Sequence, residues 1–311
     1  MSVSHSCPMF SRMHPFFLAL LMWTMFTVIY FHISSCWNAR NMCSNICKNL
    51  LSIDSNGRIQ VQPAYQAFRL AEIHQSFPIN KSARQRWKIK ATGKMFLCKY
   101  HATQIGFFTR ERPDKKLYGK YPMTGNLLLQ MRHDAMIGLP GGGIRPGENI
   151  KQGLLRELVE EMAVQSTDGI RYLLSYHNPN NIYCGHLFAK EVTWTKLREL
   201  GQRALASPDS GLENVGYLFM PTLNEVEDDP GFDGLPTFLA QAIAPGSPPL
   251  LVGNTLQQIL HVMTEATDPP VLPKEYIRIG IDRACTLLAK TVCKPAGSKK
   301  STGATLSNFF Q

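Results

Sequence analysis

The sequence predicts an α/β domain in which short strands alternate with amphipathic helices, and three observations support this. Short apolar runs separated by polar turns predict strands. A glycine-rich loop over residues 139–148 leads into an apolar-periodic helix over 150–162. The alternation then continues to the end of the domain. The predicted strands are 95–100, 103–108, 126–132, 170–176, 182–189 and 215–220, and the later helices are 193–204, 235–243, 253–265 and 273–293.

The central helix has a clear start signal. Asn149 is a plausible N-cap, and Gln152 three residues later completes a capping-box pattern. The chain of 311 residues has room for one large domain or for one domain with extensions. We place the catalytic domain at 91–293, an N-terminal extension or linker with a possible helix at 63–75 over 41–90, and a disordered tail over 294–311.

The first forty residues contain an uncharged apolar run, residues 16–33. This run is slightly short for a transmembrane helix, which needs about 20 apolar residues, and long for the core of a signal peptide. Three interpretations therefore stay open for residues 1–40: a membrane anchor, a signal peptide, or a segment that the mature protein lacks.

Charge and cysteine content give two further expectations. The net charge is +10, and residues 81–120 account for it, with twelve Lys and Arg against Glu111 and Asp114. Such a basic stretch suits an anionic partner such as a nucleotide or RNA, or it forms a solvated basic face. The eight cysteines are scattered without a C-x-x-C pair, so we expect most of them to be reduced.

The segment over 142–164, GGIRPGENIKQGLLRELVEEMAV, carries the chemistry. Glu157, Glu160 and Glu161 share one helical face, where three like charges repel each other. Divalent cations relieve that repulsion, because Mg²⁺ and Mn²⁺ take oxygen ligands and also bind phosphates. Arg156 can pair with one carboxylate. The alternative is a surface helix with a solvated acidic stripe. The glycine loop and Arg156 also occur at fixed sequence spacings from the three glutamates, which argues against that alternative.

This spacing resembles the Nudix box, G-x5-E-x7-R-E-U-x-E-E-x-G-U, in which U is bulky and apolar. Gly141, Gly142 and Glu148 form its loop, and Ala163 departs from the pattern where the box has Gly. The resemblance implies an α/β/α sandwich around a mixed sheet. Over about 95–265 the chain is similar to the snoRNA-decapping, inosine diphosphate-cleaving subgroup, through LYGKYPM (117–123), LLLQMRHDAMIGLPGG (127–142), HLFAK (186–190), GLE (211–213) and GLPTFL (234–239).

The resemblance also implies roles for single residues. The metal ligands are Glu157, Glu160 and Glu161, joined by His177 near the metal site. Arg132 and Gln258 match residues that contact the substrate. Leu139 stands where the relatives have a Phe, and Gln104 or His101 stands where the purine pocket of the relatives has a His.

The expected reaction is hydrolysis of a pyrophosphate link with Mg²⁺ or Mn²⁺, or Co²⁺, as cofactor. Metal ions neutralise phosphate charge and lower the pKa of bound water. Substrates would be (deoxy)inosine diphosphate or the 5′ cap of a snoRNA or mRNA. The proton acceptor would be a box carboxylate, Glu213 or His177. The alternatives are an ADP-ribose-type pyrophosphatase and a non-catalytic nucleotide or RNA binder.

Partners and location remain expectations. The C-terminal Leu306, Phe309 and Phe310 resemble a sliding-clamp-binding box whose leading Gln is replaced by Gly303. The related subgroup implies a homodimer, and a nuclear, nucleolar and cytoplasmic location. A membrane anchor at 16–33 is the competing interpretation, and it conflicts with a clamp-binding tail.

Overall fold

A mixed sheet organises the domain in the computed structural model, which describes residues 51–53, 59–61, 65–76, 78–79, 87–91, 94–111, 116, 119, 123–178, 180, 182–224, 234, 238, 251–272, 277–278, 281–283 and 285–286. Seven strands run in the order β11-β7-β6-β10-β9-β3, with β8 paired to β7. The β6–β10 pair is parallel and the others are antiparallel. The strands are β3 (Gln66–Phe68), β6 (Tyr100–Thr109), β7 (Met123–Arg132), β8 (Ile137–Gly138), β9 (Arg171–Asn178), β10 (Tyr183–Glu191) and β11 (Asn214–Asn224).

Two short hairpins and four helices complete the described elements. The hairpins pair β1 (Leu51–Ile53) with β2 (Ile59–Val61), and β4 (Trp87–Ala91) with β5 (Lys94–Cys98). The helices are α2 (Glu72–Gln75), α3 (Ile150–Met162), α4 (Trp194–Ala204) and α6 (Thr255–Glu265).

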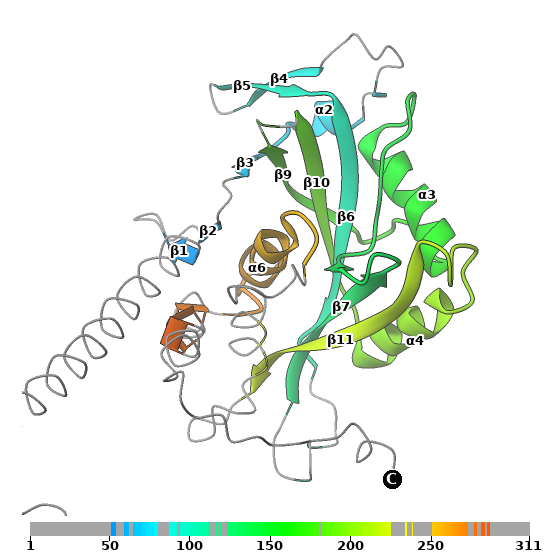
Figure 1. The fold of residues 1–311 in the computed structure, drawn as a ribbon, viewed down its shortest axis with the longest axis vertical. Helices are drawn as coiled ribbons and strands as arrows, with labels where there is room; N and C mark the ends of the chain where they lie inside the picture. Colours follow the sequence, from blue (N-terminus) through cyan, green and yellow to red (C-terminus); the bar gives the residue numbers. More distant parts are fainter. Residues whose placement is uncertain are drawn as a thin grey trace, which may run out of the picture. The chain divides into compact units, whose positions relative to one another are not determined.

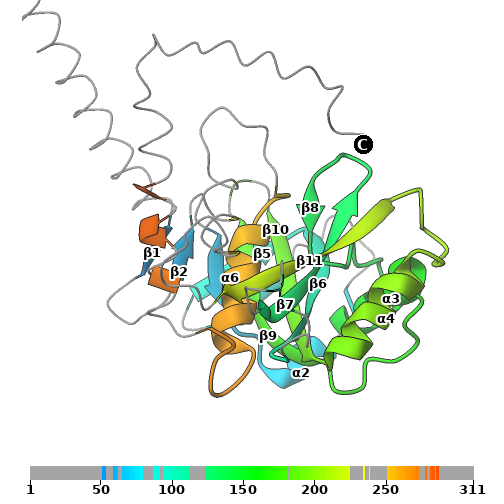
Figure 2. The same cartoon turned by 90° about the horizontal axis from the view of Figure 1, so that it is seen from below.

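The helices cover both faces of the sheet, which gives the expected α/β/α sandwich (Figures 1 and 2). Ile105 and Phe107 of β6 point to one face, where they join a buried cluster with α3 and α4. Alternate residues of a strand point to opposite faces. On the opposite face α6 packs over the sheet, and Tyr176 Oη hydrogen-bonds His261 Nδ1 at 2.8 Å.

Local signals define both ends of α3. Asn149 Oδ1 accepts from the backbone N–H groups of Lys151 and Gln152, and Gln152 Oε1 accepts from the Asn149 N–H, so the capping box is confirmed. The helix ends at Ala163, whose φ of 51° is left-handed, and the Val164 N–H bonds back to the Leu158 carbonyl at 3.0 Å. A left-handed residue at the end of a helix is most often glycine.

Strands β6 and β7 diverge, and the glycine loop fills the opening. The two strands pair only at Phe108↔Leu127 and Thr109↔Asn126. Beyond that point the loop bonds to β6 instead, through Thr103 N–H to Gly142 O at 2.9 Å and Ile105 N–H to Pro140 O at 3.0 Å. The loop therefore runs beside the middle of the sheet.

Some expectations for the N-terminal region were wrong. The expected helix at 63–75 contains strand β3 and only one turn of helix, α2. Pairing of β3 with β9 decides this, because it is a long-range contact that local sequence does not encode. The sheet thus extends into the 41–90 segment that was assigned to a linker.

The expectation of reduced cysteines was also wrong for Cys98, Cys184 and Cys285, which are disulfide-bonded. Cys98 and Cys184 are joined by a disulfide, with Cα atoms 5.6 Å apart and a sequence separation of 86. Both side chains are buried. Nothing in their spacing marks them as partners, because β5 and β10 belong to different sheets that come together only in the folded chain.

Several expectations lie outside the described residues. These are the apolar run 16–33, the tail 294–311 with its clamp-box resemblance, much of the basic stretch 81–120, and most of the helix expected at 235–243. In the part of the chain that the structure describes, no helix has the length and apolar character needed to span a bilayer.

Candidate active site

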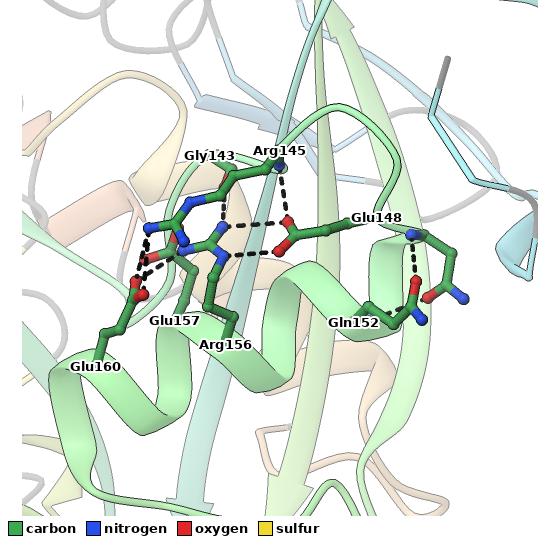
Figure 3. A network of polar contacts seen from close by, with 8 residues as sticks. Gly143, Arg145, Glu148, Gln152, Arg156, Glu157 and Glu160 are labelled. Carbon is green, nitrogen blue, oxygen red and sulfur yellow. Dashed lines mark hydrogen bonds and ion pairs between the residues drawn. The ribbon is translucent and has the colours of Figure 1, made fainter. Parts of the chain in front are cut away.

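Arg156 is the centre of a carboxylate network on the middle and last turns of α3 (Figure 3). Its Nε donates to Glu148 Oε1 at 2.8 Å, and its Nη1 donates to both Glu157 Oε1 and Glu160 Oε2 at 2.8 Å. Its Nη2 reaches the Gly143 carbonyl at 2.5 Å. Burial lowers the Arg156 pKa, but the hydrogen bonds that Arg156 donates to three carboxylates outweigh burial and raise that pKa above its ordinary value.

The glycine loop is fixed to this network at its far end. The Arg145 N–H donates to Glu148 Oε2 at 2.8 Å, while the Arg145 side chain reaches Glu160 Oε1 at 3.1 Å. Burial raises the pKa of Glu148, but the bonds from Arg156 and Arg145 lower it overall. Glu148 is therefore ionised and connects the loop to the helix.

Glu157 lies against the loop backbone, and Gly142 makes this possible. A Cβ atom at Gly142 would lie 2.6 Å from the Glu157 Cδ, so any side chain there would displace the carboxylate. Gly141 has φ of +129°, where L-residues are strained, and a Cβ there would collide with the Thr103 carbonyl. The two glycines of the box therefore permit close approach of carboxylate and loop.

Glu161 is held separately from the Arg156 network. Gln130 Nε2 donates to its Oε1 at 2.8 Å, and the Gly141 N–H donates to its Oε2 at 2.8 Å. The Glu161 pKa is raised to about 7, chiefly by burial and also by the charges of Glu157 and Glu213, although these two hydrogen bonds lower it. Burial likewise raises the pKa of Glu157 despite its bond to Arg156.

The three glutamates expected to bind the metal thus lie near one another, but their carboxylates do not point to one common position. Among the described residues no three acidic, His or Cys side chains already form a metal-binding cluster. Glu157 and Glu160 share Arg156, and Glu161 faces the loop. However, the charges of Glu157, Glu161 and Glu213 act on one another. The donor set fits a hard divalent cation, because it consists of carboxylate oxygens whose mutual repulsion such an ion would relieve.

The structure does not bring His177 into this group. His177 lies on β9, with β10 between it and β6, and its ring Nε2 lies 3.0 Å from the Leu97 carbonyl. No described contact joins His177 to the box carboxylates.

Gln104 and Gln258 lie together on the α6 face of the sheet. Gln258 Nε2 donates to Gln104 Oε1 at 3.1 Å and to Asn254 Oδ1 at 3.3 Å, and Gln104 Nε2 donates to Tyr183 Oη at 3.4 Å. Both hydrogens of the Gln258 amide nitrogen are therefore used, and its Oε1 is left as an acceptor. Asn254 Nδ2 is buried and has no partner among the described residues.

His101 has a different environment from Gln104. Its Nδ1 lies 3.1 Å from His186 Nε2, and His186 Nδ1 lies 2.7 Å from Ser175 Oγ. Burial lowers the His101 pKa to about 4, so the ring is neutral. Of the two candidates for the purine contact, only Gln104 contacts Gln258.

The remaining predicted substrate residues lie near the end of β7. Arg132 pairs with Asp134 at 3.1 Å and is partly exposed. Leu139 is 4% exposed, so it belongs to the core at the start of the loop. Sequence reasoning missed Gln130, Asn254 and Tyr183, since buried amides and hydroxyls carry no motif. For Gln130 the available signal was its position two residues before Arg132 on a strand of alternating faces.

Comparison with known proteins identifies the family of this chain. The Nudt16-like family model, described as U8 snoRNA-decapping enzyme-like, matches residues 102–267. A U8 snoRNA-decapping enzyme of Homalodisca vitripennis is 37% identical over 132 residues, covering 41% of this chain and 69% of that protein. The Mus musculus U8 snoRNA-decapping enzyme is 31% identical over 171 residues, with coverage of 52% and 82%. The Homo sapiens Tudor-interacting repair regulator protein is 32% identical over 130 residues, with coverage of 41% and 60%.

The fold and the box thus define a Nudix hydrolase, an enzyme that hydrolyses phosphoric anhydride bonds. The chain belongs to the Nudt16-like family within that class. Nudix enzymes generally use divalent metals.

Proposed function

We propose that this chain hydrolyses the pyrophosphate link of a 6-oxopurine nucleotide, either inosine diphosphate or the 5′ cap of an RNA, with Mg²⁺ or Mn²⁺. The observation that carries the proposal is the set of box carboxylates held around the glycine loop, with Glu157 against Gly142 and Glu161 on the Gly141 N–H. The names of the two decapping relatives support the cap as one substrate.

The amide pair on the α6 face supports a purine base. Gln258 Oε1 is an acceptor, and the buried Asn254 Nδ2 is a donor one helical turn away. The lactam edge of hypoxanthine or guanine needs this combination, with N1–H donating to Gln258 and O6 accepting from Asn254. Gln104 adjoins the glycine loop, so the base would lie next to the phosphates. Adenine presents its donor and acceptor in the reverse order, which makes ADP the informative competitor.

Each remaining residue would have a defined role in the reaction. Glu157, Glu160 and Glu161 would hold the cation, which neutralises phosphate charge and lowers the pKa of water. Arg132 would exchange Asp134 for a phosphate oxygen through a charge-assisted bond. We assign the proton acceptor to Glu213, because it is exposed and its charge acts on both Glu157 and Glu161.

The products define the first experiment. The full chain is incubated with Mg²⁺ or Mn²⁺ and with inosine diphosphate, capped RNA, ADP or ADP-ribose. We expect inosine monophosphate plus phosphate, or a cap nucleotide plus 5′-phosphorylated RNA. Glu161→Gln should lower the rate at least about a hundredfold, whereas Glu199→Gln, which removes an exposed carboxylate paired with Lys196 on α4, should not change it. Equal background rates for wild type and Glu161→Gln would refute the proposal.

A second candidate function is non-catalytic binding of a nucleotide or RNA. The similarity to the Tudor-interacting repair regulator protein, whose name denotes no reaction, favours considering it. Retention of the whole carboxylate set and of Gly142 argues for catalysis. The same substrate panel separates the two, because a binder would show saturable nucleotide binding without product. The homodimer, the sliding-clamp contact and the nuclear or membrane location remain proposals for sizing, peptide-binding and imaging experiments.

A further inference from the structure

Gln130 is a buried amide whose side-chain nitrogen donates to a carboxylate. It lies near the end of β7, two residues before Arg132, and is 3% exposed. A buried amide is costly unless it is hydrogen-bonded, so its partner matters. That partner is the Glu161 carboxylate, at 2.8 Å.

The contact differs in kind from those of the neighbouring carboxylates. Glu157 and Glu160 are paired with a guanidinium group, which offsets their charge. Glu161 instead receives two uncharged donors, the Gln130 amide and the Gly141 N–H. Neutral donors fix the position of a carboxylate while its full negative charge stays available to a cation. A Lys or Arg at position 130 would fix the side chain equally well but would compete with the metal.

The position of Gln130 on β7 adds a second consequence. Residues 128, 130 and 132 share one face of the strand, since alternate residues point the same way. Leu128 packs in the core, Gln130 holds Glu161, and Arg132 reaches the surface. Two residues of a strand span about 6–7 Å. One rigid strand thus sets the distance between a metal-binding carboxylate and the arginine assigned to phosphate.

The far side of Glu161 is anchored as well. Its backbone carbonyl accepts from Tyr217 Oη at 2.8 Å and from Asn214 Nδ2 at 3.3 Å, both on β11. With the backbone fixed by β11 and the loop holding Oε2, Gln130 decides where Oε1 points.

We propose that Gln130 is a positioning residue that orients the Glu161 carboxylate for the divalent cation without offsetting its charge. This inference rests on the proposed function, because it assumes that Glu161 binds the metal. It predicts that Gln130 influences metal binding rather than nucleotide binding.

The test measures Mn²⁺ binding to the full chain in the absence of nucleotide, by titration with detection of free Mn²⁺. Gln130→Leu removes the donor at similar size, and Gln130→Asn keeps an amide that is too short to reach. Both should weaken Mn²⁺ binding about 10–100-fold, as loss of a partner of a metal ligand does. With inosine diphosphate, kcat should fall while KM changes by less than about threefold.

The matched control is Asn126→Leu, which removes a buried amide on the same face of β7, four residues away. It should leave Mn²⁺ affinity unchanged, even if it alters the melting temperature. A double-mutant cycle completes the design, since Gln130→Leu should have no further effect on Mn²⁺ affinity in a Glu161→Gln background.

The outcomes separate the two claims. If Glu161→Gln weakens Mn²⁺ binding but both Gln130 variants bind like wild type, the positioning role is refuted and the proposed function stands. The positioning role would also be refuted if the losses of Mn²⁺ affinity from Gln130→Leu and Glu161→Gln were additive in the double variant. If wild type and Glu161→Gln bind Mn²⁺ equally poorly, the proposed function fails and this inference fails with it.

Discussion

Replacing Ala163 by glycine should stabilise the protein, although the change removes a methyl group. Ala163 ends α3 with φ of 51° and ψ of 35°, a left-handed conformation. That conformation costs an L-residue about 1–2 kcal/mol. Glycine avoids this cost but loses about 0.4–1 kcal/mol through the greater freedom of the unfolded chain. We therefore expect the free energy of unfolding to rise by about 1 kcal/mol, which corresponds to a melting temperature about 2–4 °C higher for a domain of this size.

The measurement is urea and thermal unfolding of the full chain, and the structure supplies a matched control. Ala266 ends α6 at the equivalent position, but its φ is −72°. Glycine there relieves no strain, so Ala266→Gly should destabilise by about 0.5–1 kcal/mol. If the two substitutions shift stability in the same direction by similar amounts, α3 does not end in a left-handed residue and the reasoning is wrong.

Three other predictions concern the box itself. Because burial raises the Glu161 pKa to about 7 from 4.5, its neutral form is favoured in the folded state. The stability this contributes below about pH 4.5 should be lost as the pH rises through 7, by up to about 3 kcal/mol. Urea unfolding in EDTA at pH 5 and pH 8 measures this, and Glu161→Gln should flatten the dependence. Gly142→Ala forces the Glu157 carboxylate to move, so we expect a loss of about 1–3 kcal/mol in unfolding free energy together with a fall in kcat. A wild-type rate for this variant would contradict the close contact. Arg156→Lys keeps the positive charge, but a lysine cannot hydrogen-bond Glu148, Glu157 and Glu160 at the same time as the forked guanidinium does. The free energy of unfolding should therefore drop by about 2 kcal/mol. An unchanged denaturation midpoint would refute this.

The parts of the fold that the sequence predicted are those defined by local signals. The capping box at Asn149 and the periodic apolar residues gave α3 its observed bounds, Ile150–Met162. The strands after the loop were each predicted within a few residues. By contrast, β3 has three residues and joins the sheet only through β9, more than 100 residues later. No local pattern encodes such a partner.

The candidate site shows the same division. Glu157, Glu160 and Glu161 were predicted because their spacing is a property of one helix. Gln130 and Asn254 were not, because their role depends on which atom of another element lies opposite. The choice between His101 and Gln104 likewise needed the fold. The two side chains point to opposite faces of β6, and only the fold shows which of these faces α6 covers.

The bonds between the glycine loop and β6 limit how this enzyme can adapt to its substrates. Because Pro140 and Gly142 take the place of a neighbouring strand, swinging the loop outward would break ladder bonds at Thr103 and Ile105 in the interior of the domain. A hinged lid is therefore a poor description of this segment. We therefore expect discrimination between bulky and small leaving groups to depend on residues outside the loop, such as the turn after β7 and the residues before α6, which contact β8.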